Sequence, residues 1–364
     1  MSHYKEAAIP VAAAQPQESR QAGTGRTRAA IIGLGQIGNQ FDDDPKRTEI
    51  WTHAGAYLAV PEVGLVAGAD PDADRLHRFV KGRRVSNGYR DYREMLRSET
   101  IDLLSICSPT AFHHEMVLEG VKAGVKAIFC EKPLAATVEQ AMDMVEACES
   151  AGVVLAVNHS RRWEAIYIHA KRLLAQGEIG VLKSIVGHYP GKVFTMGTHL
   201  FDLMRFYAGN VEWACGDATD HGEGELNLSG YLHFRSSVQG TVVSGWDRAN
   251  HLFELELLGS RGRICLFGDG DRLEVSRFED SPRYSGYREL SQAQAEDPAL
   301  LHGENRLVVA VKDIVRCVQS DKVPACSGRD GLAALEVAWA LCESATRGHT
   351  RIEFPLYRSL SQWR

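Results

Sequence analysis

The stretch FTMGTHLFD, residues 194–202, places a histidine among small and apolar residues, where it could transfer protons. An imidazole such as that of His199 can act as a general acid or base near neutral pH. Thr195 precedes His199 by four residues, and Asp202 follows it by three. On a helix, Asp202 would lie one turn from His199 and could orient its ring. The same pattern also suits an ordinary buried histidine at the start of a helix.

Lys132 is a second candidate for a role in chemistry, because it lies near the end of the apolar segment VKAIFCEKP, residues 125–133. If this segment is a parallel strand, Lys132 points from its carboxyl end into the crevice where α/β sheets bind ligands. A partly buried ammonium polarises a carbonyl or binds a hydroxyl, and it loses its proton more easily than a free lysine. Glu131 is expected to orient the turn, and Pro133 to fix the chain direction. The alternative is a surface lysine at a strand end.

The first half of the chain has the alternation that builds such a crevice. Apolar strands are predicted at 29–32, 63–70, 101–109, 125–133 and 152–159, and helices at about 71–80, 112–124 and 138–150. A capping box, Thr137-x-x-Gln140, opens the last of these helices. Buried strands separated by amphipathic helices predict a parallel sheet covered on both faces.

A glycine triplet, Gly33-x-Gly35-x-x-Gly38, follows the first predicted strand. The first glycine permits a tight turn, the second lets the backbone approach a pyrophosphate, and the third lets helix and strand pack closely. The backbone N–H groups of Gln36 and Ile37, at the helix start, would then bind the phosphates. A dinucleotide-binding site is therefore predicted here.

Asp70 ends the second predicted strand and would accept hydrogen bonds from both ribose hydroxyls of the dinucleotide. Its charge would repel a 2′-phosphate, which favours NAD over NADP. Arg75, the nearest cation, is expected to point to solvent. Asp70 lies farther from the glycines than is usual, and the polar stretch 42–48 predicts an inserted loop with the helix resuming near Trp51.

Three further motifs occur in order, Ser108-Pro109-x-x-x-His113, Glu131-Lys132-Pro133 and Gly197-x-His199-x-x-Asp202. With the glycine turn they make residues 28 to about 355 resemble the glucose–fructose oxidoreductase/inositol dehydrogenase (GFO/IDH/MocA) family. The resemblance implies an α/β fold: a Rossmann domain at 28–155 and an α+β domain at 156–364 with a large open, mostly antiparallel sheet. Residues 1–27 would form a disordered tail. Period-two patterns after residue 181, a hairpin at 255–269 and helices near 305–319 and 330–344 agree, and a late helix could pack back on the first domain.

The resemblance also implies roles for individual residues. Lys132 and His199 would be catalytic. Ser108, Pro109, His113, Glu131 and Lys132 would lie beside the cofactor, and Thr195 and Asp202 beside the substrate. In the stretch NHSRRW, residues 158–163, Asn158 and His159 lie where the substrate crevice is expected. One of Arg161 and Arg162 could clamp a substrate carboxylate or phosphate, and the other would form a structural ion pair. Many family members carry an aspartate at the position of Thr195, so the full set of proton-transfer groups is not carried over. Two adjacent histidines, His113 and His114, lack a sensibly spaced third ligand, and no zinc site is expected.

These features predict an NAD-dependent oxidoreductase that moves hydride between nicotinamide and a secondary alcohol or ketone of a sugar, sugar acid, cyclitol or sugar derivative. One alternative is an enzyme that retains NAD and uses transient oxidation to cleave a glycosidic bond or to exchange hydride between substrates. Another is a non-catalytic NAD-binding protein. By analogy with the family, a homodimer or homotetramer is expected.

The composition limits the other classes. A chain of 364 residues suits two domains, and its net charge of −6 with interspersed signs argues against a nucleic-acid partner. No apolar run approaches the ~20 residues of a membrane span, and residues 1–27 lack the apolar core of a secretory signal. The eight cysteines never form a C-x-x-C pair, which indicates free thiols in the cytoplasm.

Overall fold

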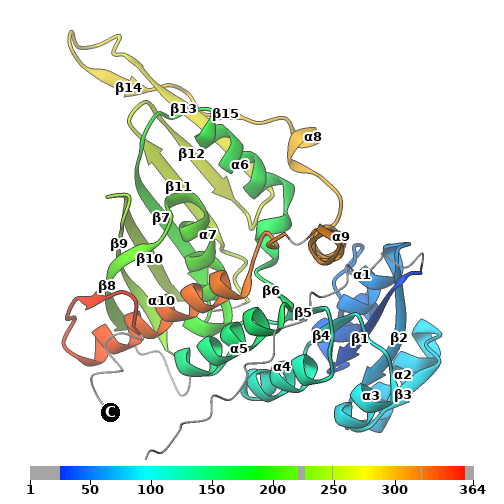
Figure 1. Cartoon of the computed structure of the whole chain (residues 1–364). Coiled ribbons are helices and arrows are strands. Elements are labelled where there is room, and N and C mark those ends of the chain that lie inside the picture. Colours follow the sequence, from blue (N-terminus) through cyan, green and yellow to red (C-terminus); the bar gives the residue numbers. More distant parts are fainter. Residues whose placement is uncertain (1–24, 220–225, 248, 321, 357–364) are drawn as a thin grey trace, which may run out of the picture.

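The computed structural model in Figure 1 describes residues 25–219, 226–247, 249–320 and 322–356. Most of the tail predicted at 1–27 lies outside the described residues. The first strand, β1 (Thr27–Ile32), begins two residues earlier than expected. No helix among the described residues is long and apolar enough to cross a membrane.

The first half forms a parallel sheet of six strands in the order β3-β2-β1-β4-β5-β6. After β1 these are β2 (Val63–Ala69), β3 (Asn87–Tyr89), β4 (Leu103–Ile106), β5 (Ala127–Cys130) and β6 (Val154–Val157). The helices of this half are α1 (His53–Ala59), α2 (Ala73–Arg83), α3 (Tyr92–Ser98), α4 (His113–Lys122) and α5 (Val138–Ala151). This strand order places a ligand crevice at the carboxyl ends of β1 and β4, where the winding reverses.

Two local predictions in this half need correction. Helix α2 begins at Ala73 rather than residue 71, because Asp72 caps it by accepting from the N–H groups of Asp74 and Arg75. Helix α5 starts where expected, with the Thr137 hydroxyl accepting from the Gln140 N–H. The reciprocal half of the capping box is not formed, since Gln140 Oε1 is buried without a hydrogen-bond partner.

The predicted interruption of the first helix is present. A π-helical turn, η1 (Gln36–Gln40), and a 3₁₀ turn, η2 (Phe41–Asp43), are followed by a loop, and α1 begins only at His53. The Asp42 carboxylate closes this loop. It accepts hydrogen bonds from the Trp51 N–H at 2.7 Å, the Thr52 hydroxyl at 2.5 Å and Arg83 at 2.9 Å.

The second half contains a ten-stranded sheet, mostly antiparallel, in the order β14-β13-β12-β11-β7-β10-β9-β8-β16, with β15 paired to β13. Within the described residues of this sheet, β7 and β10 are the one pair that runs in parallel. Its strands are β7 (Leu182–Pro190), β8 (Val211–Thr219), β9 (Asn227–Phe234), β10 (Gln239–Trp246), β11 (Glu254–Gly259), β12 (Gly262–Phe267), β13 (Arg272–Asp280), β14 (Arg288–Leu290), β15 (Gln294–Ala295) and β16 (Ile352–Glu353). The predicted fold class, including the hairpin at 255–269, is confirmed.

Helices α6 (Ala165–Ala175), α7 (Thr198–Ala208) and α10 (Gly328–Thr346) cover one face of this sheet (Figure 1). Gly216 and Gly230 let α10 lie directly on β8 and β9, because a Cβ at either position would come within 3 Å of Leu341. This face presents buried residues such as Leu232, Val242 and Ala214, and it carries the second apolar core.

Helix α9 (Arg306–Ser320) follows the short α8 (Pro298–Leu301) and lies against the first half, where it contacts α1, β5 and β6. Its buried residues Leu307, Val311 and Ile314 belong to the apolar core of the parallel sheet. The chain therefore returns from the second sheet to complete the core of the first.

Candidate active site

A cleft of about 740 Å³ opens at the carboxyl ends of β1, β2 and β4. It is lined by seven of the predicted cofactor-binding residues: Gly33, Gly35, Gln36, Ile37, Asp70, Ser108 and Pro109. Phe41, from the interrupted first helix, also lines it. The turn just before the inserted loop therefore contributes a residue to the cleft.

The three glycines of the turn serve different ends. Gly33 has φ +87°, and a Cβ there would come 2.7 Å from the Cys107 backbone. A Cβ on Gly38 would come 2.1 Å from the Gly33 carbonyl oxygen, so this glycine is required for packing rather than for lining the cleft. At Gly35 a Cβ would meet only Arg75 Nη1, at 3.7 Å. The backbone at Gly35 is thus open to the cleft, and the turn fits a pyrophosphate.

Asp70 is buried at the end of β2 and lies on the cleft. One oxygen accepts from the Leu34 N–H at 2.8 Å, and the other accepts from the Asp72 N–H at 2.9 Å. As expected, Arg75 is exposed to solvent, with 45% of its side chain accessible, and it also lines the open cleft. Its guanidinium lies 3.9 Å from Asp70 and 3.5 Å from Asp72, so two carboxylates share this cation.

Glu131 lies beneath the cleft at the head of a buried polar chain. Its Oε1 accepts from Asn158 Nδ2 at 2.6 Å and contacts His53 Nε2 at 3.1 Å. His53 Nδ1 lies 2.7 Å from the Ser105 hydroxyl, which lies 2.5 Å from the Tyr57 hydroxyl. Burial raises the pKa of Glu131, but the hydrogen bonds of His53 and Asn158, together with the charge interactions with His53 and Lys132, outweigh it, so the net pKa is lowered. An ionised Glu131 lets each donor in this chain point toward it.

His113, predicted beside the cofactor, is buried behind the turns instead. Its Nε2 lies 2.9 Å from the Ser108 carbonyl, and its Nδ1 lies 3.1 Å from the Pro133 carbonyl. Both ring nitrogens are therefore used to join two backbone turns. His114 points elsewhere, with Nε2 2.6 Å from Asp143 of α5.

Lys132 connects the two halves of the molecule. Its Nζ donates to the backbone carbonyl of Thr195 at 2.5 Å. Thr195 belongs to a π-helical turn, η5 (Val193–Gly197), that leads directly into α7. The ammonium at the end of β5 is thereby held beside the segment that carries His199.

His199 is the second residue of α7 and is buried, with 7% of its surface exposed. Burial lowers its pKa well below the usual value, and the charges of Lys132 and Arg161 lower it further. Its Nδ1 is buried without a hydrogen-bond partner. The ring is therefore neutral, as a general base requires, but no described carboxylate hydrogen-bonds to it.

The remaining predicted substrate residues are placed differently from the expectation. Asp202 is fully buried, and both of its oxygens accept from Arg162 at 2.8 Å. Arg161 forms a two-nitrogen contact with Asp269 and lies over the Phe253 ring. Both arginines are thus bound to carboxylates of the protein. A substrate carboxylate would have to displace one of these contacts.

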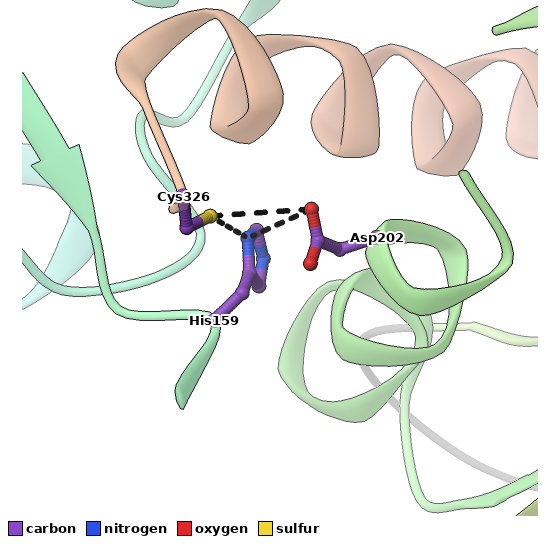
Figure 2. Close-up of side chains that lie close together, drawn as sticks. All are labelled: His159, Asp202 and Cys326. Atoms are coloured by element: carbon purple, nitrogen blue, oxygen red, sulfur yellow. Dashed lines mark hydrogen bonds and ion pairs between the residues drawn. The ribbon is translucent and has the colours of Figure 1, made fainter. Parts of the chain in front are cut away.

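Asn158 and His159 follow β6 at the junction and are both buried. Figure 2 shows His159, Asp202 and Cys326 pointing toward one another from three separate segments. His159 Nδ1 lies 3.7 Å from Cys326 Sγ and 3.8 Å from Asp202 Oδ1. Among the described residues, this is the group whose spacing could hold a metal ion. The guanidinium of Arg162 on Asp202 opposes a second cation there.

A second cavity of about 450 Å³ shares Thr195 with this region. Lys192, Asn227, Trp246 and Asp247 contribute side chains to its lining. Asn227 Oδ1 is buried without a partner. The cavity thus offers an aromatic ring for stacking, an amide for hydrogen bonding, and one positive and one negative side chain. Such a combination suits a ligand with several hydroxyl groups.

Sequence reasoning missed His53 and Ser105. A serine inside the apolar run LLSI is a detectable signal, since a buried hydroxyl must find a partner. His53 was hidden by the insertion, which separates it from the glycine turn. His159 was expected at the crevice beside Asn158, but its contacts could not be predicted, because its partners Asp202 and Cys326 lie far along the chain.

Comparisons with known proteins agree with this geometry. Residues 27–159 match the model of an oxidoreductase family with an NAD-binding Rossmann fold, and residues 190–265 match the GFO/IDH/MocA C-terminal domain. A myo-inositol 2-dehydrogenase of Thermotoga maritima is 28% identical over 346 residues, covering 87% of this chain and 96% of that protein. A D-apiose dehydrogenase of Paraburkholderia graminis is 29% identical over 352 residues and 89% of each chain.

The fold recurs in solved structures. An NAD binding oxidoreductase from Klebsiella pneumoniae superposes with a TM-score of 0.77 at 21% identity, covering 91% of this chain and all of that one. The parallel sheet with its glycine turn and the antiparallel sheet behind it are thus matched as one arrangement. The chain belongs to the GFO/IDH/MocA family of NAD-binding oxidoreductases.

Proposed function

We propose that this protein is an NAD-dependent dehydrogenase acting on a secondary alcohol of a sugar or cyclitol, with Lys132 and His199 as its catalytic residues. The observation that carries the proposal is the bond from Lys132 Nζ to the Thr195 carbonyl at 2.5 Å. This bond holds an ammonium against the turn that leads into α7, the helix that carries the neutral imidazole of His199. The relatives named as inositol and apiose dehydrogenases support the substrate class.

Bound NAD would supply the hydride acceptor of this reaction, held by the glycine turn and Asp70. The chain's own groups manage the hydroxyl of the substrate. His199 accepts the hydroxyl proton, and the Lys132 ammonium stabilises the negative charge that develops on the oxygen. In the reverse direction the same groups protonate a ketone oxygen.

The charges at the site favour a neutral polyol over a sugar acid. Arg161 and Arg162 are already paired with Asp269 and Asp202. A cavity that holds Trp246 and Asn227 beside Thr195 offers a ring face and an amide, which suit a ring bearing hydroxyls. We therefore assign the substrate to this cavity, which Thr195 joins to the Lys132 ammonium.

NAD is the preferred cofactor in this proposal. Asp70 lies on the cleft where the adenine ribose would bind, and its carboxylate repels a 2′-phosphate. Arg75 does not reverse this preference, because Asp70 and Asp72 lie within 3.9 Å of its guanidinium.

The domain division at residue 156, the homodimeric or homotetrameric state and the cytoplasmic location are further parts of the proposal. Two apolar cores support the division, with the reservation that α9 belongs to the first. All eight cysteines are free thiols, as a reducing compartment allows.

The decisive experiment measures NADH formation by purified protein with a panel of cyclitols and sugars. We expect turnover with at least one of them. Lys132→Met should lower kcat by about 1000-fold while NAD affinity stays within about twofold, because the ammonium acts on the reacting oxygen. Lys122→Met is the matched control, since Lys122 is an exposed lysine of α4 paired with Glu119.

Other outcomes have distinct meanings. A folded Lys132→Met enzyme with full turnover would contradict the role of Lys132. Product formation without free NADH, detected by mass spectrometry, would indicate an enzyme that retains NAD. Binding of NAD with no product from the whole panel would indicate a non-catalytic binding protein.

A further inference from the structure

Three buried polar atoms at the domain junction have no hydrogen-bond partner: Asn158 Oδ1, His159 Nε2 and His199 Nδ1. Buried polar atoms are nearly always paired, so each of these needs an explanation. Two of them belong to rings in contact. The His159 and His199 rings meet edge to face, with centroids 5.4 Å apart.

The surroundings of His159 decide which of its nitrogens holds a proton. Asp202 Oδ1 lies 3.8 Å from Nδ1, and an anionic oxygen beside a nitrogen favours the protonated over the bare atom. Cys326 Sγ, 3.7 Å from the same nitrogen, can accept its N–H while its thiol points to Asp202. Nδ1 is then the donor, and Nε2 carries a lone pair with nothing to bind.

The unpaired Nδ1 of His199 can supply the N–H donor that this lone pair lacks. For His199 to take a proton at Nε2, its Nδ1 must already carry the other proton, as an N–H donor. The neighbouring ring offers an acceptor at Nε2. The two unpaired atoms therefore satisfy each other if one ring turns or a water molecule bridges them.

We propose that His159 is a positioning residue that links Asp202 to His199, in the order Asp202, His159, His199, substrate hydroxyl. The Nδ1–H of His199 donates to His159 Nε2, and His199 Nε2 accepts the hydroxyl proton as the carbinol hydrogen leaves as hydride to NAD. The product is a ketone, and the released proton stays on His199 until it passes to solvent. The link gives His199 the orientation that Thr195 cannot supply.

Several charges act on the two rings, from every element around them. Lys132 at the end of β5, Arg161 beside it and Arg306 of α9 oppose a proton on His199. Around His159, Asp202 of α7 and Asp330 of α10 favour a proton, whereas Arg162 and Lys132 oppose it. Burial is the largest influence and lowers the pKa of His159 to about 4. His159 therefore stays neutral and can act as an acceptor at working pH.

A metal ion is the competing explanation for the cluster in Figure 2. It would have to share Asp202 with Arg162, whose nitrogens already donate to both carboxylate oxygens at 2.8 Å. It would also require a thiolate, and burial raises the pKa of Cys326 well above its usual value. The proposed link leaves the Arg162 contact with Asp202 and the protonated thiol of Cys326 unchanged.

The inference rests on the proposed dehydrogenase function, and its test separates the two. In the purified protein without substrate, long-range ¹H–¹⁵N NMR of labelled histidines should show His159 with a proton on Nδ1 and a bare Nε2, assigned by loss of that signal in His159→Ala. A His159 protonated on Nε2 would overturn the inference whether or not the protein turns over substrate. So would stoichiometric zinc in the purified protein.

In the active enzyme, His159→Ala should lower kcat by about 10- to 100-fold with KM for NAD within about twofold, because a weaker base remains. The acid limb of the kcat/KM profile should move to lower pH, since imidazolium at His199 loses an acceptor. Added imidazole should restore part of the rate, and His159→Gln, which keeps an acceptor, should lie between. His169→Gln is the control, because this buried histidine bonds Glu296 away from the site.

A structural role for His159 would lower stability and rate without moving the pH limb and without rescue by imidazole. That outcome, with His199→Ala inactive, would overturn the link while leaving the proposed function intact. Absence of NADH formation by the wild type would count against the proposed function, and the NMR result would still decide the link.

Discussion

Buried charged side chains at the junction of the two sheets are matched in pairs, and these pairs determine which residues remain available for substrate. One of Arg161 and Arg162 was expected to clamp the substrate. Instead, Arg161 is paired with Asp269 and Arg162 with Asp202. Sequence could place Lys132, since the end of a strand is a local property. It could not find its partners, because Thr195 lies 63 residues away and Asp269 lies 108 from Arg161.

In the proposed function, the preference for NAD over NADP depends on the single charge of Asp70. Asp70→Asn keeps an oxygen for the ribose and removes the charge. We expect kcat/KM for NAD to fall about tenfold and that for NADP to rise about tenfold, because a charged hydrogen bond and a repulsion are both lost. Steady-state kinetics with both cofactors provide the measurement.

Asp74→Asn is the matched control for this change, because Asp74 lies in the first turn of α2 and does not line the cleft. Its cofactor ratio should equal that of the wild type. If Asp70→Asn also kept the wild-type ratio, the assignment of Asp70 to the ribose would be wrong.

Individual elements were predictable wherever their signals are local. Five of the six parallel strands were located from apolar runs, whereas β3 has only three residues and no buried pattern. The interruption of the first helix was located from its polar, proline-bearing sequence. The place of α9 was left open, because an amphipathic stripe gives no information about which core it will join.

The glycine turn gives a prediction at this scale, because its glycines have separable purposes. Gly35→Ala should fold with unchanged stability and lose NAD affinity by about tenfold or more, since only the approach of the pyrophosphate is obstructed. Gly38→Ala should cost about 2–4 kcal/mol, because its Cβ meets the Gly33 carbonyl. Urea unfolding and NAD titration measure the two effects.

Whether Gly38→Ala lowers or raises the free energy of unfolding tests the packing of this turn. Glycine to alanine within a helix ordinarily stabilises by about 1 kcal/mol. A Gly38→Ala protein that matched or exceeded wild-type stability would therefore rule out the close approach of η1 to the β1 turn.

At the scale of the whole molecule, the large sheet is covered by helices on one face, and its other face carries aromatic side chains. Trp213 stacks on His233 with centroids 5.2 Å apart and contacts the tilted ring of Tyr231 at 5.3 Å, while Arg351 lies over its ring at 4.4 Å. Such a flat, partly apolar face is suited to pairing with a second copy of the chain.

We expect the wild type to sediment as a dimer or tetramer and Trp213→Glu to shift toward the monomer, because a charge would be buried at the contact. Sedimentation velocity over a range of concentrations is the measurement. Leu58→Glu, at an exposed position of α1, serves as the control. A monomeric wild type, or a variant that assembles normally, would contradict an interface on this face.

The return of α9 to the first sheet has a consequence for biosynthesis. Val308, Val311 and Ile314 complete the core of the parallel sheet, yet the ribosome makes them after all the strands of both sheets except β16. The nucleotide-binding half therefore emerges with an apolar surface that its own later chain must cover. Nascent chains stalled before residue 306 should bind chaperones that recognise exposed apolar surface, and the full-length chain released from the ribosome should not.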